Sequence, residues 1–543
     1  MRADPRIAHA HLFHLSYSNL WNMVRDISSF LQLLEQYEIF FISCPLFFSL
    51  LAIFVVVVFI RTTNKRNLLL PPSPPKLPII GNLHNIGRYP HRSLKSLAQR
   101  FGPLMSLRFG NFPILVVSSA DAASEIKKTH DLTFVNRPKR SLFQKLLYDY
   151  KDVASAPYGE YWRQMKSICV VNLLSNRRDK SYQGVREEET ALAVEKIEKS
   201  SSLCSPVNLS ELFSATTNNV ICRIALGRKY SEDTNKFGKL LNEFTELLGT
   251  LDVGDYLPWL AWLSHVNGLH GKAEKVAKEL DEFLDGVLEE HMNRHDRHLN
   301  DHAGIQGEYQ KDFVDILLEI QRENTVGFPL EKISLKALIL DIFAAGTDTT
   351  YVVLEWAMTE LLRYPKIMKK LQNEVRNVSA ENPSISVDDL DNMRYLKAVI
   401  KETLRLHPPI PLLLPTISTK DVKLKGYDII QGTQVIINAW AIGRDLASWE
   451  NPEEFLPDRF LDNSIDFKGQ HFELIPFGSG RRICPGILFA IAINELLLAN
   501  LVHKFDWSLP GGAKEKDLDM TETGGLTIRK KSPLIAVANR CSF

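Results

Sequence analysis

One stretch near the N-terminus constrains the fold of this chain more than any other. Residues 39–60, IFFISCPLFFSLLAIFVVVVFI, carry no charge and are long enough to cross a hydrocarbon layer of about 30 Å as a helix, which satisfies its own backbone in lipid. Arg61, Lys65 and Arg66 follow at once, whereas the nearest basic residue upstream is Arg25. Because basic flanks stay on the cytosolic side, we expect a single-pass anchor that leaves the bulk of the protein in the cytosol.

The alternative for residues 39–60 is a cleaved signal peptide, but a secretory apolar region is usually shorter, lies nearer the N-terminus and ends in small residues. Residues 1–38 form a long lead before the predicted anchor. Because Met23 would leave a more usual short lead, we suspect that residues 1–22 are a translation-start artefact.

The remainder of the chain is predicted to be a linker followed by one large domain. Residues 61–80 are basic and then rich in proline, and PPSPP at 71–75 favours extended polyproline geometry, so we expect a stiff spacer. Residues 81–543 show no internal repeat and no further change of composition, and we predict a single domain there. Within it, polar stretches rich in turn-forming residues predict surface loops at 295–310 and 377–388.

Composition excludes some classes of protein. With 45% hydrophobic and 24% charged residues, the chain of 543 residues can bury a large core. The 65 Lys and Arg residues nearly balance the 64 Asp and Glu residues, so net charge gives no reason to expect a nucleic-acid partner. The six cysteines are scattered without a C-x-x-C pair, which indicates neither a disulfide framework nor a zinc site and fits a reducing compartment.

Helical periodicity dominates, and the predicted fold class is mainly α with small β-sheets (α+β). Short β-like runs occur at 113–118 and 434–438. One functional helix is predicted from Ser334, as its N-cap, to Arg363, where Tyr364-Pro365 stops it. A second is predicted from Met393 to Leu406, before the prolines that follow His407.

A glycine-rich loop near the C-terminus carries the strongest chemical signal. Residues 477–486 read FGSGRRICPG and precede an apolar helix predicted at 487–501. Glycines let the backbone approach a flat ligand, amides at a helix N-terminus favour a thiolate, and Arg482 offers a cation to an anion. A lone cysteine among apolar neighbours is more often buried filler, so the interpretation of Cys484 as a ligand depends on the surrounding pattern.

Three further segments are ambiguous when taken alone. Residues 402–405, ETLR, form an i, i+3 ion pair of the kind found on solvated helix faces. Residues 345–350, AGTDTT, place weak helix formers in the middle of the first functional helix, which indicates either a packed kink or a functional site. Residues 162–166, WRQMK, fit an ordinary amphipathic helix as well as an anion site.

Together these segments resemble the motifs of the cytochrome P-450 superfamily. The loop at 477–486 matches the haem-binding signature F-x-x-G-x-R-x-C-x-G at every fixed position. The family's E-x-x-R, P-E-R-F, A-G-x-D-T-T and W-R-x-x-R elements have counterparts at 402–405, 457–460, 345–350 and 162–166. The resemblance implies a cytochrome P-450 fold, with residues 81–543 as a haem-thiolate catalytic domain that binds haem b.

The resemblance also assigns roles at the haem. Cys484 would be the axial thiolate, which donates electron density to iron and favours O–O cleavage. The other haem-binding residues implied are Arg482, Trp162, Lys166, Phe477, Gly480 and Gly486. Asp348 and Thr349 are expected to relay protons to the reacting oxygen, and Gly346 to leave room for dioxygen.

Behind the haem, the resemblance implies a buried charge network of Glu402, Arg405 and Arg459, which would be costly to break. Two positions depart from the family pattern. Lys166 replaces the last Arg of W-R-x-x-R, and Thr416 stands where relatives usually have an Arg that contacts a haem propionate. We expect the second contact to be weaker or to be supplied elsewhere.

Segments 71–81, 438–441 and 466–469 resemble the plant A-type branch of the family, most of all members of specialised metabolism that oxidise monoterpenoids and coumarins, psoralen synthase among them. The resemblance implies a monooxygenase anchored in the endoplasmic reticulum membrane that inserts one oxygen atom of O2 into a small apolar metabolite. NADPH-cytochrome P-450 reductase would deliver electrons from NADPH, and cytochrome b5 is a further candidate partner.

Two other functions would also use a haem-thiolate site or a bound haem. A haem-thiolate hydroperoxide isomerase or lyase needs neither dioxygen nor a reductase, and Asp348 and Thr349 argue against it. A non-enzymatic haem-binding protein would explain neither that pair nor the substrate-facing segments expected at 137–158 and 410–414.

Overall fold

The computed structural model describes residues 48–49, 52, 68–229, 234–300, 310–324, 327–379 and 382–541; at 234–237 and 295–300 only the backbone is described. The chain divides into two units, Met1–Leu69 and Leu70–Phe543. The predicted anchor at 39–60 lies almost entirely outside the described residues. The fold described below is that of the second unit.

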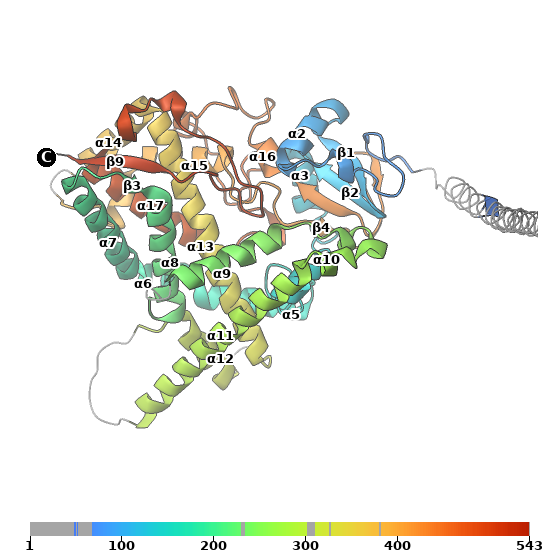
Figure 1. The fold of residues 1–543 in the computed structure, drawn as a ribbon, viewed down its shortest axis with the longest axis horizontal. Coiled ribbons are helices and arrows are strands. Elements are labelled where there is room, and N and C mark those ends of the chain that lie inside the picture. The colour runs from blue at the N-terminus through green and yellow to red at the C-terminus, as the bar shows by residue number, and fades with distance from the viewer. Residues whose placement is uncertain are drawn as a thin grey trace, which may run out of the picture. The chain divides into compact units, whose positions relative to one another are not determined.

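Helices make up most of this unit, as the sequence predicted (Figure 1). The described helices are α2 (Pro90–Phe101), α3 (Ala120–Ser124), α4 (Ser141–Leu146), α5 (Glu160–Ser167), α6 (Asn176–Ser181), α7 (Gln183–Ser202), α8 (Leu209–Leu226), α9 (Thr234–Gly249), α10 (Leu263–Val266), α11 (Leu269–Asn300), α12 (Phe313–Glu323), α13 (Lys332–Arg363), α14 (Pro365–Ser379), α15 (Arg394–Leu406), α16 (Ala439–Ile442) and α17 (Ile487–Lys504).

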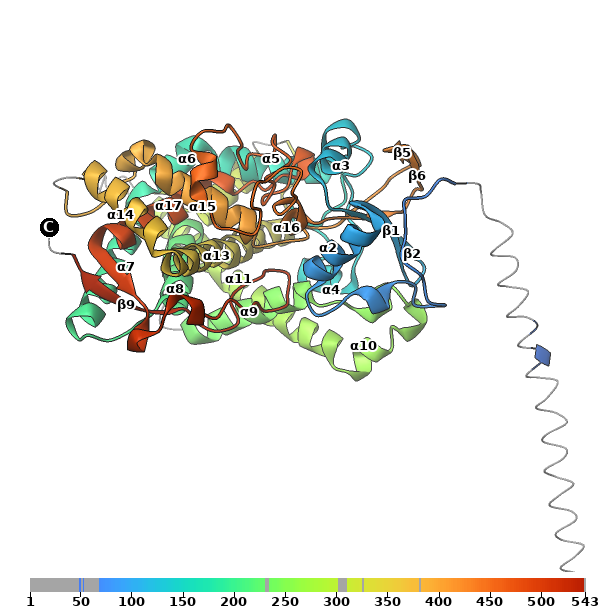
Figure 2. The ribbon, with the colours of Figure 1, turned by 90° about the horizontal axis from the view of Figure 1, so that it is seen from above.

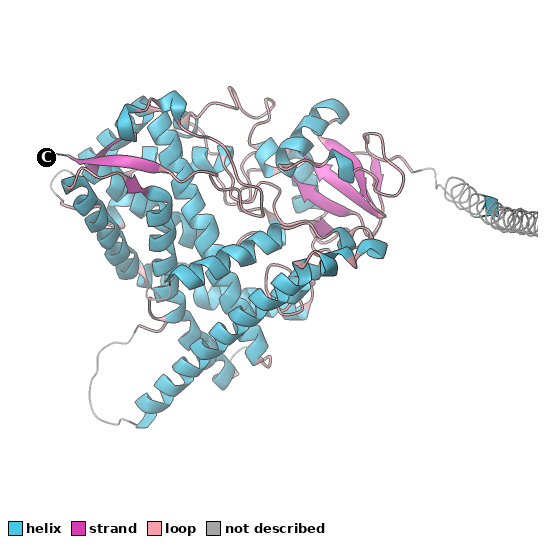
Figure 3. Cartoon of the chain, in the orientation of Figure 1, coloured by secondary structure: helices cyan, strands magenta, loops and turns pink. Residues whose placement is uncertain are grey.

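The strands form three small sheets in the described part of the chain. The largest has the order β1 (Leu104–Phe109), β2 (Phe112–Val117), β7 (Gln434–Ile437) and β4 (Thr416–Ile417). The others join β3 (Val207–Asn208), β9 (Ile535–Arg540) and β8 (Phe505–Ser508), and β5 (Val422–Leu424) and β6 (Tyr427–Ile429). Strand β2 pairs parallel with β7, with Val117 opposite Ile437, so both β-like runs predicted from sequence meet in one sheet. Figure 3 shows this sheet at one end of the unit, beside the helical part.

Helix α13 is the central element of the fold and passes through the helical part in both views (Figures 1 and 2). It packs against α8, α17 and α15, and it supplies residues to the two largest apolar clusters of the core. Among the described residues, α13 and α17 are long and apolar enough to cross a membrane, but most of each is buried inside the protein, as in core helices.

The helix boundaries confirm one prediction and correct two others. Helix α15 agrees with the predicted second helix to within one residue. Helix α13 begins earlier than predicted: its N-cap is Glu331, because the Ser334 hydroxyl is buried and engaged by the hydroxyl of Tyr161 at 3.1 Å. The loop predicted at 295–310 is wrong for its first part, because α11 continues to Asn300. Polar composition did not distinguish a loop from the solvated end of a helix.

The proline segment, predicted to be a stiff spacer, is docked on the folded unit. Its carbonyl groups accept hydrogen bonds from the folded body, with Ser106 N donating to Pro72 O at 2.8 Å and Asn82 Nδ2 to Pro75 O at 3.1 Å. Pro71 and Pro74 are buried. Proline lacks an N–H group but keeps a free carbonyl, so an extended proline run can still dock along a neighbouring segment. Residues 71–75 therefore belong to the body.

Candidate active site

A cavity of about 270 Å³ collects segments that lie far apart in the sequence. Its walls come from α5, α13, the turn before β4 and the loop that precedes α17. Of the predicted site residues, the cavity is lined by Gly346, Thr349, Trp162, Lys166, Phe477, Arg482, Cys484 and Gly486. Parts of both predicted substrate-facing segments, including Val153 and Ile410, also line it.

Cys484 lies on this cavity just ahead of α17. Its backbone N–H donates to Phe477 O at 3.0 Å, which closes the loop at 477–486. Burial raises the pKa of the Cys484 thiol above its ordinary value, while the backbone N–H of Gly486 and the charge of Lys166 act in the opposite direction. Coordination of a metal ion deprotonates a thiol outright, so this sulfur is suited to be a metal ligand once an ion is present.

Gly480 has a different part in the loop. It lies outside the cavity lining, with φ +72, and a Cβ there would stand 2.9 Å from Lys127 O and 2.5 Å from Asp131 Oδ1. The residue is needed because the loop packs closely against the segment 125–131. Gly480 therefore shapes the site without lining it.

The cavity wall beside Trp162 is crowded with cations. Arg482 lies over the Trp162 ring at 4.5 Å, and Trp162 Nε1 donates to Val153 O at 3.0 Å. Lys166 donates to the carbonyl of Arg481. Arg137, which sequence reasoning did not single out, shares this wall and donates to Pro415 O at 3.0 Å. Its one available signal was its position at the start of the predicted segment 137–158.

These cations indicate what the cavity is built to hold. Burial, and then the charge of Arg482, lowers the pKa of Arg137 to about 9. Burial likewise lowers the pKa of Arg482 to about 10, opposed by Asp152. The two guanidinium groups repel each other, and an anionic ligand bound beside them would reduce this repulsion. A thiol, a glycine-rich loop and buried cations around one cavity fit haem, which carries a metal ion and two carboxylates.

The pair predicted on α13 divides between two faces of the helix. Thr349 lines the cavity, and its hydroxyl donates to Ala345 O at 2.6 Å. Asp348 does not line the cavity; its Oδ1 lies 3.5 Å from Arg529 Nη2, while its Oδ2 is buried without a partner in the described part of the chain. Arg529, on the segment before β9, had no sequence signal that would have paired it with Asp348.

Gly346 also lines the cavity, but the structure gives it a packing reason as well. A Cβ at this position would lie 2.9 Å from Ile221 Cδ1 on α8. The helix is continuous through residues 345–350, so the cluster of weak helix formers does not break it. The hydroxyl of Thr349 donates back to the Ala345 carbonyl, a bond that a continuous helix accommodates.

Asp341 is a further acid of the cavity wall that sequence reasoning missed. Its Oδ2 accepts a hydrogen bond from Val153 N at 2.6 Å. Burial, and then the nearby charge of Asp152, raises the pKa of Asp341 well above its ordinary value. The available signal was a single acid within the apolar run ALILDIFA at 337–344.

Glu402, Arg405 and Arg459 lie together; the side chains of Glu402 and Arg405 are fully buried, and that of Arg459 is partly exposed. Arg405 donates to both oxygens of Glu402, at 2.6 and 2.8 Å, and Arg459 Nε lies 3.2 Å from Glu402 Oε1. Leu456 N donates to the same carboxylate at 2.7 Å. The network ties α15 to the segment 443–460, which precedes the glycine-rich loop at 477–486.

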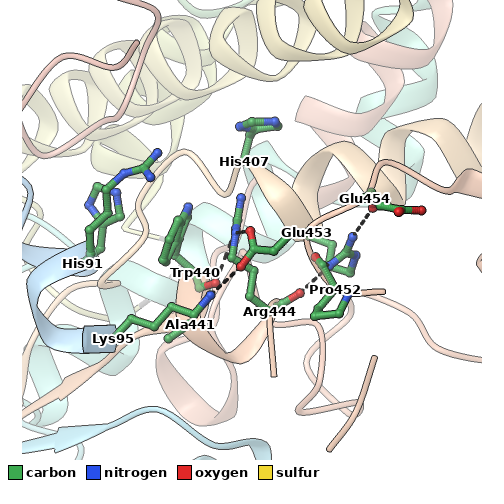
Figure 4. A network of polar contacts seen from close by, with 12 residues as sticks. His91, Lys95, His407, Trp440, Ala441, Arg444, Pro452, Glu453 and Glu454 are labelled. Carbon is green, nitrogen blue, oxygen red and sulfur yellow. Dashed lines mark hydrogen bonds and ion pairs between the residues drawn. The ribbon is translucent and has the colours of Figure 1, made fainter. Parts of the chain in front are cut away.

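Figure 4 shows how this region continues toward α2. Arg405 Nη1 donates to Pro452 O at 2.7 Å, and Arg405 Nη2 donates to Glu454 O at 2.9 Å. Glu453 then bridges two cations, with Lys95 Nζ at 2.6 Å and Arg444 Nε at 3.0 Å. Arg444 also covers the ring of Trp440 at 4.0 Å. A continuous polar layer therefore joins α15 to α2.

The family follows from the comparison of this chain with known proteins. The sequence model of the family Cytochrome P450 matches residues 71–537, so the chain belongs to the cytochrome P450 family. A zebra fish cytochrome P450 solved with abiraterone shares the fold, with a TM-score of 0.69 at 22% identity, covering 84% of this chain and 100% of that one.

Plant relatives narrow the assignment. Cytochrome P450 736A117 of Prunus mume is 61% identical over 505 residues, covering 91% of this chain and 96% of the relative. Cytochrome P450 71A26 of Arabidopsis thaliana is 52% identical over 505 residues, covering 92% and 99%. Norfluorocurarine oxidase of a Strychnos species is 51% identical over 498 residues, covering 90% and 97%. The chain is a cytochrome P450 monooxygenase of the plant A-type branch.

Proposed function

We propose that this monooxygenase oxidises a small, largely apolar plant specialised metabolite such as a coumarin or a terpenoid. The observation that carries the proposal is a single cavity lined both by Cys484 and by Thr349, with apolar side chains between them in the lining. These side chains are Leu338, Ile342, Ile410, Leu413, Leu414 and Phe489. The name of norfluorocurarine oxidase indicates that a relative of similar sequence oxidises a plant metabolite.

Electrons and location form the second part of the proposal. NADPH-cytochrome P-450 reductase would supply NADPH-derived electrons, with cytochrome b5 as a further candidate donor. Residues 39–60 would anchor the chain in the endoplasmic reticulum membrane, because an uncharged apolar stretch of this length followed by Arg61 and Lys65 favours a cytosolic catalytic domain.

Haem b would be held by Cys484 as metal ligand. Arg137, Arg482, Trp162 and Lys166 would serve its carboxylates, with Phe477 and Gly486 against its face. When bound, the haem supplies the thiolate-ligated iron at which dioxygen is reduced and cleaved. The protein's own task is then to exclude bulk water, to hold the substrate and to deliver protons.

Proton delivery would be the work of α13. Asp348, paired with the partly exposed Arg529, would bring protons from solvent through the helix. Thr349 would pass them on inside the cavity: its hydrogen is given to Ala345 O, so its oxygen is left to accept a hydrogen bond from a water molecule. The apolar side chains that surround the substrate supply no proton, so a polar relay on this part of α13 would be needed.

The haem assignment is tested by Cys484→Ser. An alcohol oxygen does not replace thiolate donation, so we expect this variant to lose the band near 450 nm of the reduced carbon monoxide complex. Cys169→Ser changes the other buried cysteine of the cavity wall and should keep the band. Persistence of the band in the Cys484 variant would refute the assignment.

The relay is tested by Asp348→Asn and Thr349→Ala. We expect the first to slow turnover by about 10 to 1,000-fold, as for loss of a general acid or its relay. The second should bind substrate and consume NADPH but release hydrogen peroxide in place of product. Thr347→Ala is the control, because Thr347 is buried on the same helix outside the cavity lining. The relay is refuted if both variants hydroxylate at the parent rate with the parent coupling of NADPH consumption to product. Residues 345–350 would then have only a structural role in the helix.

A further inference from the structure

Lys127 is a cation of the cavity that none of the roles above uses. It lies in the turn Glu125–Thr129 after α3 and lines the cavity. Among the described residues, its ammonium group has no hydrogen bond and no ion pair. Burial, and then the charge of Arg137, lowers the pKa of Lys127 to about 7, and Arg482 acts in the same direction. A partly buried cation beside two others favours the binding of an anion.

The carboxylate nearest to Lys127 is already engaged. Asp131 raises the pKa of Lys127, but its Oδ2 accepts from Arg481 N at 3.2 Å and lies 3.3 Å from Arg481 Nε. Lys127 itself forms no ion pair with Asp131 within 4 Å. Lys127 therefore lines the cavity without a direct ion-pair partner among the described residues, and Asp131 compensates its charge only from a distance.

Thr416 provides the second, independent observation. It is 2% exposed, lines the same cavity, and its Oγ1 has no hydrogen-bond partner in the described part of the chain. The neighbouring carbonyls of Leu414 and Pro415 are both taken by Arg137 Nη1, at 2.5 and 3.0 Å. The guanidinium group of Arg137 therefore lies next to position 416. The family resemblance expects an Arg at this position, and this chain has Thr416.

We propose that Lys127 pairs with a haem carboxylate, assisted by the Thr416 hydroxyl, and takes over the contact that an Arg at position 416 would make. This inference rests on the proposed haem site. A bound haem brings two carboxylates to a wall that holds Arg137, Arg482 and Lys127, so the repulsion among these cations is reduced when the carboxylates lie between them. An ammonium group acts as a point charge and does not require the planar geometry of a guanidinium.

The adjacent lysine supplies a matched control. Lys128 is exposed and does not line the cavity. We would compare Lys127→Met with Lys128→Met in the full-length holoenzyme, transferring haem to excess apomyoglobin and following the decay of the band near 450 nm. Loss of a charge-assisted hydrogen bond predicts haem release about tenfold faster for Lys127→Met and unchanged for Lys128→Met. Lys127→Arg should release haem at the parent rate.

A second comparison distinguishes loss of the Lys127 contact with haem from a folding defect of the Lys127→Met variant. Adding Thr416→Arg to Lys127→Met should restore the parent rate of haem release, because it returns a cation to the same wall. The propionate bending band in the resonance Raman spectrum should shift in Lys127→Met and not in Lys128→Met. Parent haem release in Lys127→Met, or a weakened interaction with the reductase as its sole effect, would overturn the proposal. Absence of the band near 450 nm in the parent protein would instead refute the haem site itself.

Discussion

Two glycines of the haem-binding loop show how much a single residue depends on its surroundings. Gly478 and Gly480 both have φ near +70, a conformation that L side chains rarely adopt. A Cβ on Gly478 would meet nothing within 4 Å, whereas a Cβ on Gly480 would meet the backbone of Lys127 and the carboxylate of Asp131. Sequence reasoning gave both the same reason, close approach to a flat ligand, but Gly480 is required by contact within the protein.

The two glycines therefore predict different costs for one substitution. Gly478→Ala carries the backbone strain alone, about 1–2 kcal/mol. Gly480→Ala adds a clash with backbone that cannot rotate away, and we expect a further loss of about 1–3 kcal/mol together with a lower yield of haem-loaded protein. Urea unfolding and the absorbance of the carbon monoxide complex measure both effects. Equal losses in the two variants would show that the segment at 125–131 yields to the added methyl group.

At the scale of elements, the C-terminal segment is held to α2 through one buried acid. Glu522 accepts from Arg92 Nη2 at 2.9 Å and from Arg92 Nε at 3.1 Å, and its Oε2 lies 3.2 Å from His91 Nε2. Burial by itself would raise the pKa of Glu522, but the hydrogen bonds from His91 and Arg92 outweigh it and lower the pKa to about 2. These contacts join residues more than 400 positions apart.

Because this pKa is lower in the folded protein than in the unfolded chain, the ionised acid stabilises the fold above its ordinary value of 4.5. The contribution, about 2–3 kcal/mol, should be lost as the pH falls from 4.5 toward 2. Glu522→Gln should accordingly lower the free energy of unfolding at pH 7, with a difference from the parent that shrinks in acid. Asp391→Asn, at an almost fully exposed acid, should change it little. A pH-independent difference for Glu522→Gln would contradict the linkage.

At the scale of the whole molecule, the catalytic unit needs no membrane segment to complete its core. Its two most apolar helices, α13 and α17, are largely buried within Leu70–Phe543. The proposal of membrane attachment through residues 39–60 rests on their composition and flanking charge.

The proposed topology predicts the outcome of truncation. Removal of residues 1–60 should release much of the protein from microsomes while the band near 450 nm persists. The sequons at Asn208 and at the exposed Asn377 should stay free of glycan, because a cytosolic domain does not meet the glycosylation machinery. Glycan on either asparagine, found by mass spectrometry of the microsomal protein, would reverse the orientation.

The sequence by itself determined those features that depend on neighbouring residues. The apolar periodicity and the prolines after His407 located α15 to within one residue, and the β-like runs located β2 and β7. The resemblance of the motif at 477–486 to the family signature singled out Cys484, and the structure places this residue on the cavity. Such signals are local, because helix geometry, proline stereochemistry and metal ligation constrain residue types within a few positions.

Only the tertiary structure decided which charged groups share the cavity. Arg137 and Lys127 carry no motif and Asp341 lies in an apolar run, yet all three line it. The partner of Asp348 proved to be Arg529, from the other end of the domain. Burial and the meeting of like charges depend on how distant segments pack, and long-range packing leaves no periodic trace in the sequence.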